Sequence, residues 1–145
     1  MIPFLDDGLV YIDTPILIYS VEKHPRYVSH LSQFWKSVEA RIITVLSSEL
    51  TLLECLILPF RKHDKALIHD YQCFFDRGII TLLPISREIL HEAALLRGGI
   101  QTLKTPDAIH ADTALSAGCK TLFTNDNGFS RVSDWRLSFL KVWSE

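Results

Sequence analysis

The sequence has 145 residues, 48% of them hydrophobic, and 15 lysines and arginines against 17 aspartates and glutamates give a net charge of −2. One domain over residues 1–145 is expected at this length, and because no run of twenty residues is free of charge, a membrane-spanning protein is excluded, as is one that coats nucleic acid by charge alone. Three widely spaced cysteines form neither a disulfide framework nor a zinc pattern, and no basic leader begins the chain, so a cytoplasmic location is expected.

Short apolar, β-branched runs alternate along the chain with segments whose apolar residues recur every three or four positions. The runs predict buried strands and the periodic segments predict amphipathic helices. In chain order, the expected elements are a strand at 9–12, helices at 16–22 and 28–40, a strand at 42–46, a helix from Ser48 to Pro59, a helix at 69–76, a strand at 79–83, helices at 86–97 and 106–117, and strands at 121–124 and 139–143.

The helix over 106–117 carries a start signal. Thr105 is expected as its N-cap, and Pro106 suits the first helical position, where a missing N–H costs nothing. Asp107 then falls in the first turn, where the helix dipole favours an anion. Because the neighbouring residues are small and apolar, we expect a deeply packed helix with one carboxylate at its buried start.

Two other helices have predicted inward faces. In the helix that Ser48 caps, Glu54 lies on or beside the apolar side, which is an unusual place for a surface acid. That side is expected to hold Leu50, Leu53, Leu56 and Ile57. In the helix over 86–97, the residues expected to face inward are Ile89, Leu90, Ala93 and Leu96.

The alternation of strands and helices predicts an α/β domain with a mostly parallel sheet of about five strands. Open sheets of this kind bind ligands at the carboxyl ends of their strands. Asp13 ends the first strand, Asp126 follows the fourth, and Asp107 begins the helix that leads into the fourth. The topology therefore predicts three acids at one edge of the sheet, with Glu54 as a fourth candidate.

Each acid alone has an ordinary structural interpretation, as a helix cap, a turn residue or a solvated helix acid. Together, however, carboxylates raise one another's pKa, so a fold keeps a cluster of them only if a cation neutralises it. Oxygen ligands with no histidine or cysteine in register select a hard ion such as Mg²⁺ or Mn²⁺. Such an ion activates a water and holds a phosphate oxygen, so the cluster indicates phosphodiester hydrolysis.

Five segments of the sequence carry a further pattern. They are Tyr11-Ile12-Asp13-Thr14, Ser48-Glu49-Leu50-Thr51-Leu52-Leu53-Glu54, Leu95-Leu96-Arg97, Thr105-Pro106-Asp107-Ala108-Ile109-His110 and Thr124-Asn125-Asp126. In content and order they resemble the segments of PIN-domain proteins, most closely VapC-type toxin ribonucleases. The resemblance runs from about residue 10 to about residue 142, and the five segments together are much more specific than any one.

The resemblance implies a three-layer α/β/α sandwich and RNA cleavage by a water that Mg²⁺ or Mn²⁺ activates. The family's four acids fall on Asp13, Glu54, Asp107 and Asp126. Residues expected to support these acids or to contact substrate are Thr14, Ser48, Thr124, Asn125 and Arg97. The implied partners are a VapB-like antitoxin, expected in a groove between the helices over 28–40 and 50–58, and a second copy in a homodimer.

Other polar residues near this pattern keep more than one interpretation. Asp112 stands where relatives usually have a small or apolar residue, and it follows Asp107 by about 140° around the helix. It is expected outside the metal cluster, either as a surface acid or as the partner of a base on another protein. His110, one helical turn past Asp107, is interpreted as a packed or helix-face histidine, with reach toward substrate as the alternative. Arg97 is interpreted either as a partner for a site or antitoxin carboxylate or as a plain helix C-terminal charge.

Two alternative functions stay open. One is a catalytically silent PIN-fold module that acts through a protein partner, against which the presence of all four acids argues. The other is a different phosphoryl enzyme on a doubly wound sheet. A phosphatase of the haloacid-dehalogenase type needs a second aspartate two residues after Asp13, where Pro15 stands, and a receiver domain needs an aspartate after the third strand, which ends at Leu83-Pro84.

Overall fold

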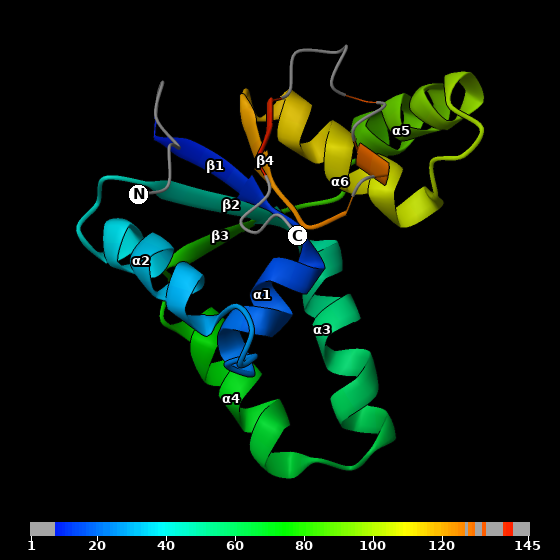
Figure 1. Cartoon of the computed structure of the whole chain (residues 1–145). Helices are drawn as coiled ribbons and strands as arrows, with labels where there is room; N and C mark the ends of the chain where they lie inside the picture. The colour runs from blue at the N-terminus through cyan, green and yellow to red at the C-terminus, as the bar shows by residue number, and fades with distance from the viewer. Residues whose placement is uncertain (1–7, 127, 130–131, 133–137, 141–145) are drawn as a thin grey trace.

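The computed structural model describes residues 8–126, 128–129, 132 and 138–140, and it places a sheet between helices (Figure 1). The strands are β1 (Leu9–Ile12), β2 (Thr44–Ser48), β3 (Ile80–Leu83), β4 (Thr121–Phe123) and β5 (Ser138–Leu140). The helices are α1 (Thr14–Val21), α2 (Val28–Glu39), α3 (Glu49–Arg61), α4 (Lys65–Asp76), α5 (Arg87–Gly99) and α6 (Thr105–Ser116).

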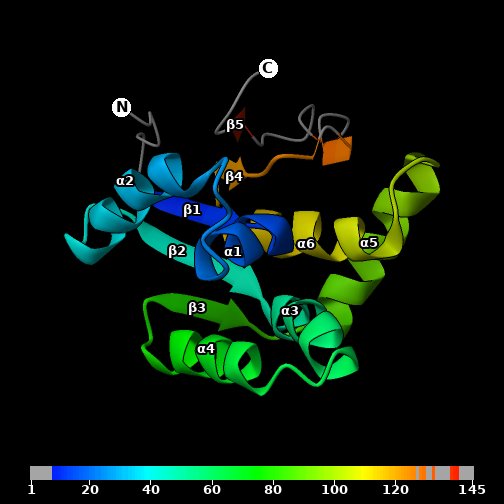
Figure 2. The same ribbon diagram turned by 60° about the horizontal axis from the view of Figure 1, so that its bottom comes forward.

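The sheet has five parallel strands in the order β3-β2-β1-β4-β5, which Figure 2 shows stacked from one edge to the other. The first strand of the chain is therefore central, with β2 on one side and β4 on the other. In the pairing of β1 with β4, Ile12 lies opposite Phe123. The predicted α/β fold with a mostly parallel sheet of about five strands is confirmed.

Alternation along the strands divides the core between the two faces of the sheet. Val10 and Ile12 of β1 pack in one cluster with Phe34 of α2, together with residues of α1, α3 and α4. Tyr11, between them in sequence, packs in a second cluster with the alanines of α6 and with Leu96 of α5. The result is the predicted α/β/α sandwich. Throughout the described ranges, no helix has the length and hydropathy that a membrane crossing requires.

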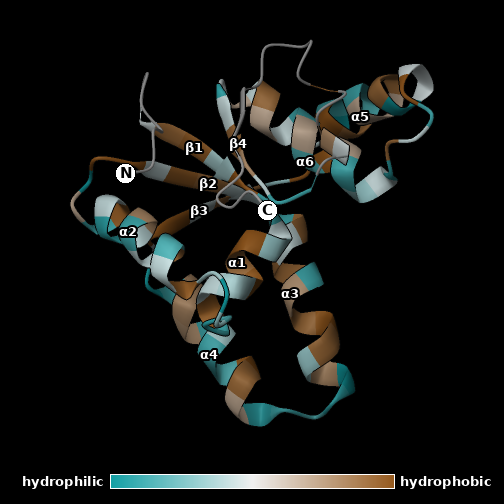
Figure 3. Ribbon diagram, in the orientation of Figure 1, coloured by the Kyte–Doolittle hydropathy of each residue, from teal (hydrophilic) through white to brown (hydrophobic). Residues whose placement is uncertain are grey.

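The helices α3 and α4 extend away from the sheet (Figure 1). The predicted inward face of α3 is wrong for Leu53 and Ile57, whereas Leu56 is partly buried and packs against the core as predicted. The buried residues of α3 are Thr51, Cys55 and Pro59, whereas Leu53 and Ile57 are 57% and 44% exposed. The reason is that α3 is apolar on several sides, and the line through Cys55, with Leu56 beside it, is the part that reaches the core. Figure 3 shows hydrophobic bands along α3, and the exposed apolar side chains of this helix are Leu52, Leu53, Ile57, Leu58 and Phe60.

Pro59 lies inside α3 and does not end it, contrary to the sequence-based expectation. A proline in a helix removes one backbone donor, so the carbonyl of Cys55 lacks the hydrogen bond that residue 59 would otherwise give it, but the loss of this one bond does not end the helix. The helix continues to Arg61, and the N–H of Lys62 still donates to the carbonyl of Leu58 at 3.0 Å.

Several element boundaries also differ from the prediction. Strand β2 begins at Thr44 and extends to Ser48, and α6 begins at Thr105, with Lys104 rather than Thr105 as its N-cap. On α5, Leu90 is half exposed and does not face inward, while the other three predicted residues of that helix are buried. The predicted last strand is found at Ser138–Leu140, and its expected continuation over 141–143 lies outside the described residues.

Candidate active site

The carboxyl ends of β1 and β4 bring Asp13 and Asp126 together. The N–H of Asp13 donates to the carbonyl of Phe123 at 3.5 Å, so Asp13 and Thr124 leave neighbouring strands side by side. The hydroxyl of Thr124 donates to Oδ2 of Asp13 and accepts a hydrogen bond of 2.9 Å from the N–H of Asp126. Two acids that are 113 positions apart in sequence thus share one threonine.

Asp13 is buried, with only 2% of its surface exposed, and burial raises its pKa to about 7. The hydrogen bond from Thr124 acts in the opposite direction, as does the charge of His110 whenever its ring is doubly protonated, while the charge of Asp126 raises the pKa further. Oδ1 of Asp13 also accepts from the N–H of Ile16 at 3.4 Å, which makes Asp13 the N-cap of α1. The capping and site interpretations therefore apply to the same residue.

Glu54 projects from α3 to the same region and is held by two donors. The hydroxyl of Thr14 lies 2.8 Å from Oε1 of Glu54, and Nε2 of His110 lies 2.7 Å from the same oxygen. Burial by itself raises the pKa of Glu54, but the hydrogen bonds from His110 and Thr14 lower it, as does the charge of His110 whenever its ring is doubly protonated, and the net pKa is lowered. No hydrogen bond to Oε2 of Glu54 is found among the described residues.

His110 was predicted to be packed, with contact to substrate as the alternative, but its hydrogen bond to an acid of the site was not predicted. It is packed, as expected, with 3% of its surface exposed, but its ring nitrogens contact Glu54 and, at 2.6 Å, the hydroxyl of Tyr11. The expectation of a site without a nearby histidine is therefore wrong. The available signal was spacing, because His110 follows Asp107 by three positions and so lies on the same face of α6.

Asp107 is half buried in the first turn of α6, as predicted. Burial raises its pKa, and so do the charges of Asp126 and Glu54, while His110 and Lys104 act in the opposite direction. The charges of Asp126 and Glu54, two of the other three acids, therefore act on Asp107. Even so, within the described part of the chain no three histidine, cysteine, aspartate or glutamate side chains form a ready-made metal cage.

The remaining predicted residues are placed as follows. Ser48 caps α3 by accepting from the N–H of Leu50 at 3.1 Å, and Asn125 is half buried beside Asp126. Arg97 donates through Nε to the carbonyl of Leu103 and through Nη1 to the hydroxyl of Thr105, both at 2.8 Å. Its guanidinium therefore ties the end of α5 to the start of α6 rather than pairing with an acid of the site.

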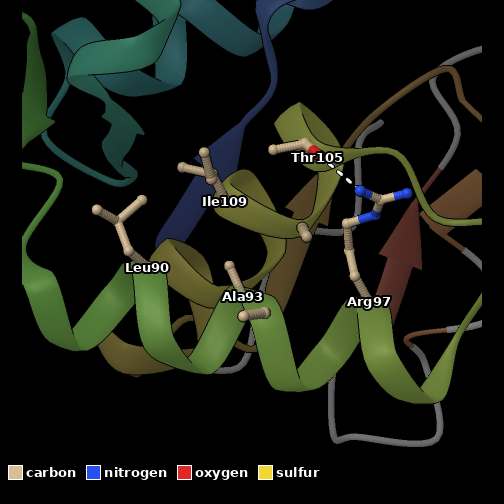
Figure 4. Close-up of a pocket in the computed structure, with 7 residues that line it drawn as sticks. Leu90, Ala93, Arg97, Thr105 and Ile109 are labelled. Atoms are coloured by element: carbon tan, nitrogen blue, oxygen red, sulfur yellow. Dashed lines mark hydrogen bonds between the residues drawn. The ribbon is translucent and has the colours of Figure 1, made fainter.

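A pocket of about 310 Å³ lies between α5 and α6, beside the start of the helix that carries Asp107. Figure 4 shows Leu90 and Ala93 on its α5 side, with Arg97 reaching over to Thr105 on α6. Its lining residues are Leu90, Ala93, Ala94, Arg97, Thr105, Ala108 and Ile109. The lining is mostly apolar, so this pocket differs in character from the acidic edge next to it.

Asp112 is not a surface acid. Only 9% of its surface is exposed, and among the described residues its Oδ2 is a buried oxygen with no hydrogen-bond partner. Burial, and then the charge of Glu92 on α5, raise its pKa to about 6. The helical spacing explains why Asp112 faces away from the acids, but the small neighbours that pack α6 also bury this side chain.

The donor set of the acidic edge fits a hard divalent cation. Its oxygens are carboxylates, and none of the four acids forms an ion pair with a lysine or arginine in the described part of the structure. A buried aspartate without a cation is costly, as the raised pKa of Asp13 shows. Mg²⁺ keeps several of its waters and needs only one or two direct carboxylates, so a closed cage is not required.

Comparison with known proteins identifies the fold and family. The sequence matches the family described as PIN domain over residues 10–134, while no curated protein matches it. Two similar solved structures are VapBC2 from Rickettsia felis bound to a promoter DNA fragment (19% identity, TM-score 0.66, 92% of this chain and 98% of that one) and a toxin–antitoxin complex from Klebsiella pneumoniae (20%, 0.66, 94% and 99%). A third is VapC20 from Mycobacterium tuberculosis, described as a sarcin–ricin loop cleaving toxin (15%, 0.68, 85% and 94%).

Proposed function

The chain belongs to the PIN domain family, and from that premise we propose that it is a metal-dependent endoribonuclease, the toxin of a VapBC-type toxin–antitoxin pair. The observation that carries this proposal is the buried Asp13 at the carboxyl edge of the sheet, whose pKa is raised by burial and further by the charge of Asp126. The charges of Asp126 and Glu54 in turn raise the pKa of Asp107, which links the four acids electrostatically. Solved structures with the same fold include a VapBC2 complex and a toxin described as cleaving the sarcin–ricin loop, which supports the proposal. A single domain and a cytoplasmic location are part of it.

In this proposal Asp13, Glu54, Asp107 and Asp126 hold Mg²⁺ or Mn²⁺. The bound ion lowers the pKa of a water and offsets charge on the phosphate of the scissile bond. The protein contributes the positions of the acids. Thr124 fixes Asp13 and the backbone of Asp126 relative to each other, and Thr14 holds Oε1 of Glu54. Asp13 must lose its proton before it can bind a cation, so its pKa of about 7 makes metal affinity depend on pH near neutrality.

The test is cleavage of RNA by purified protein with Mg²⁺ or Mn²⁺ and with EDTA. We expect cleavage only with the metal, and we expect Asp13→Asn, Glu54→Gln, Asp107→Asn and Asp126→Asn each to lose most of it while staying folded. Cleavage that persists in EDTA, or in Asp107→Asn, contradicts the proposal. Partner binding without any cleavage supports the catalytically silent module instead.

The proposed protein partner is a small VapB-like antitoxin. The exposed apolar side chains of α3 support a docking surface there, and helix-in-groove recognition is the expected mode. Figure 1 shows α1 between α2 and α3, so the two helices of the expected groove do not pack directly on each other. A hollow of about 380 Å³ lies instead between α1, α2 and α4. A homodimer is also proposed, and its test is the molecular mass in solution.

A further inference from the structure

His110 and Tyr11 form a buried chain of hydrogen bonds that ends on Glu54. The hydroxyl of Tyr11 lies 2.6 Å from Nδ1 of His110, and Nε2 of His110 lies 2.7 Å from Oε1 of Glu54. Tyr11 and His110 are each at most 3% exposed, so water does not compete for these contacts. These two hydrogen bonds connect Tyr11 at the centre of the sheet, through His110 on α6, to Glu54 on α3.

The direction of each hydrogen bond follows from the chemistry of its partners. A carboxylate accepts only, so Nε2 of His110 must carry the proton that bonds to Glu54. In a neutral imidazole the other nitrogen is then an acceptor, which suits the hydroxyl of Tyr11 as donor. Burial raises the pKa of Tyr11, so this hydroxyl keeps its proton. Glu54 and Tyr11 together therefore favour the tautomer in which His110 donates to Glu54, and loss of the Tyr11 hydroxyl removes the donor to Nδ1 that stabilises this form.

The two donors to Glu54 share one of its oxygens. Thr14 and His110 both bond to Oε1, at 2.8 and 2.7 Å, while the described residues offer no hydrogen bond to Oε2. A carboxylate held in this way has a fixed plane and one oxygen left for a ligand. A side chain that orients a metal-binding carboxylate through such a bond typically changes metal affinity or activity 10–100-fold when removed.

We propose that His110 is a positioning residue, held in its Nε2–H tautomer by Tyr11, that orients Glu54 so that Oε2 is free to bind the catalytic metal ion. This inference rests on the proposed function, because it takes Glu54 as a metal ligand. The roles are distinct: Glu54 binds the ion, His110 orients Glu54, and Tyr11 sets the tautomer of His110.

The experiment measures Mn²⁺ binding to the full chain by titration calorimetry in Tyr11→Phe, His110→Leu and His110→Gln. Removing the hydroxyl or the imidazole is expected to weaken Mn²⁺ binding about tenfold or more. His110→Gln is expected to recover part of the loss, because its amide N–H is a donor within reach of Glu54. Thr113→Val is the matched control. It removes a buried hydroxyl from α6 that bonds only to the carbonyl of Ile109 among the described residues, at 2.6 Å, and should leave Mn²⁺ affinity unchanged.

A second measurement reads the tautomer directly, by nitrogen–proton correlation spectra of the wild-type imidazole. We expect the Nε2–H form in the wild type and a mixture of tautomers in Tyr11→Phe. An Nδ1–H form or a doubly protonated ring in the wild type overturns the inference, as does Mn²⁺ affinity within twofold of wild type in both His110→Leu and Tyr11→Phe. If His110→Leu and Tyr11→Phe bind Mn²⁺ like the wild type but Glu54→Gln binds it weakly, this inference fails and the proposed function stands. If Glu54→Gln also binds like wild type, the proposed ligand set is wrong as well.

Discussion

The hydroxyl of Thr124 donates a hydrogen bond to Oδ2 of Asp13 across the boundary between β4 and β1. The hydroxyl oxygen of Thr124 also accepts a hydrogen bond from the N–H of Asp126. One neutral side chain therefore sets the relative position of two acids and also opposes the effect of burial on the pKa of Asp13. Removing the Thr124 hydroxyl keeps all four acids but disturbs their arrangement, so it tests whether the arrangement matters.

We expect Thr124→Val to destabilise the metal-free protein by about 1–3 kcal/mol, because a buried carboxylate loses its donor. The pKa of Asp13 should rise above its present value of about 7, and Mn²⁺ affinity at pH 7 should fall. Urea unfolding and Mn²⁺ titration measure the two effects. Thr113→Val is again the control, and equal Mn²⁺ affinity in the two variants contradicts the prediction.

The stability of the metal-free protein should depend on pH through Asp13. The folded state holds a proton up to about pH 7 that the unfolded chain releases near pH 4, so the free energy of unfolding falls as pH rises between these values. The loss from this residue is at most about 4 kcal/mol. Asp13→Asn should remove this fall, as measured by denaturation in EDTA from pH 4 to 8. A wild-type minus variant difference that does not change with pH contradicts the prediction.

Asp112→Asn should stabilise the protein without affecting the metal site. The folded-state pKa of Asp112 is about 6, so ionisation destabilises the fold increasingly from about pH 4 to pH 6 and by a constant amount above. The variant should gain about 1–3 kcal/mol at pH 7.5 and little at pH 4. Thermal melts at both pH values test this, with and without Mn²⁺. Loss of the Mn²⁺-induced shift would mean that Asp112 belongs to the ligand set.

Asp107→Asn should have two opposed effects on melting temperature. Without metal it removes a charge that repels Asp126 and Glu54, so the melting temperature should rise. With Mn²⁺ at ten to a hundred times its dissociation constant, the wild type should gain roughly 1–3 kcal/mol and the variant less, because a ligand is gone. Melts in EDTA and in Mn²⁺ give both numbers. An undiminished Mn²⁺ gain in the variant removes Asp107 from the ligand set.

Ile57→Asp on α3 should abolish binding of the proposed antitoxin and leave the fold intact. Ile57 is 44% exposed, so a charge there is tolerated in the free protein but not against an apolar partner surface. The measurement is co-purification with the proposed VapB-like antitoxin. Ile42→Asp, at a 62% exposed residue before β2, is the matched control and should still bind. Equal retention of the partner by both variants places the docking surface elsewhere.

The backbone plan of the fold was predictable because short apolar runs and helix caps are local signals. Leu9–Ile12 was located from its composition alone, and Ser48 and Ser86 cap helices as predicted. The side chains that face the core were harder to predict where a helix is apolar on several sides. For α3 the period alone did not distinguish the line through Cys55 from the exposed line through Leu53 and Ile57.

The acids of the site could be chosen from the sequence because topology places strand ends at one edge. The hydrogen bonds that hold these acids in place could not be predicted, because they depend on contacts between segments that are far apart in the sequence. Nothing local shows that Tyr11 bonds to a ring 99 positions away or that this ring holds Glu54. The burial of Asp112 was likewise hidden, because it depends on how closely α5 and α6 pack. The roles of the acids as metal ligands stay predictions.

The strand order has a consequence for how the protein is made. The neighbours of β1 are β2 and β4, and the pairing of Val10 with Thr121 joins residues that the ribosome adds 111 positions apart. A nascent chain that ends before β4 therefore lacks Thr124 and Asp126, and Asp13 has no donor from that side. The acidic edge is completed only after residues 121–126 have left the ribosome, so copies whose synthesis has not reached this segment lack part of the edge.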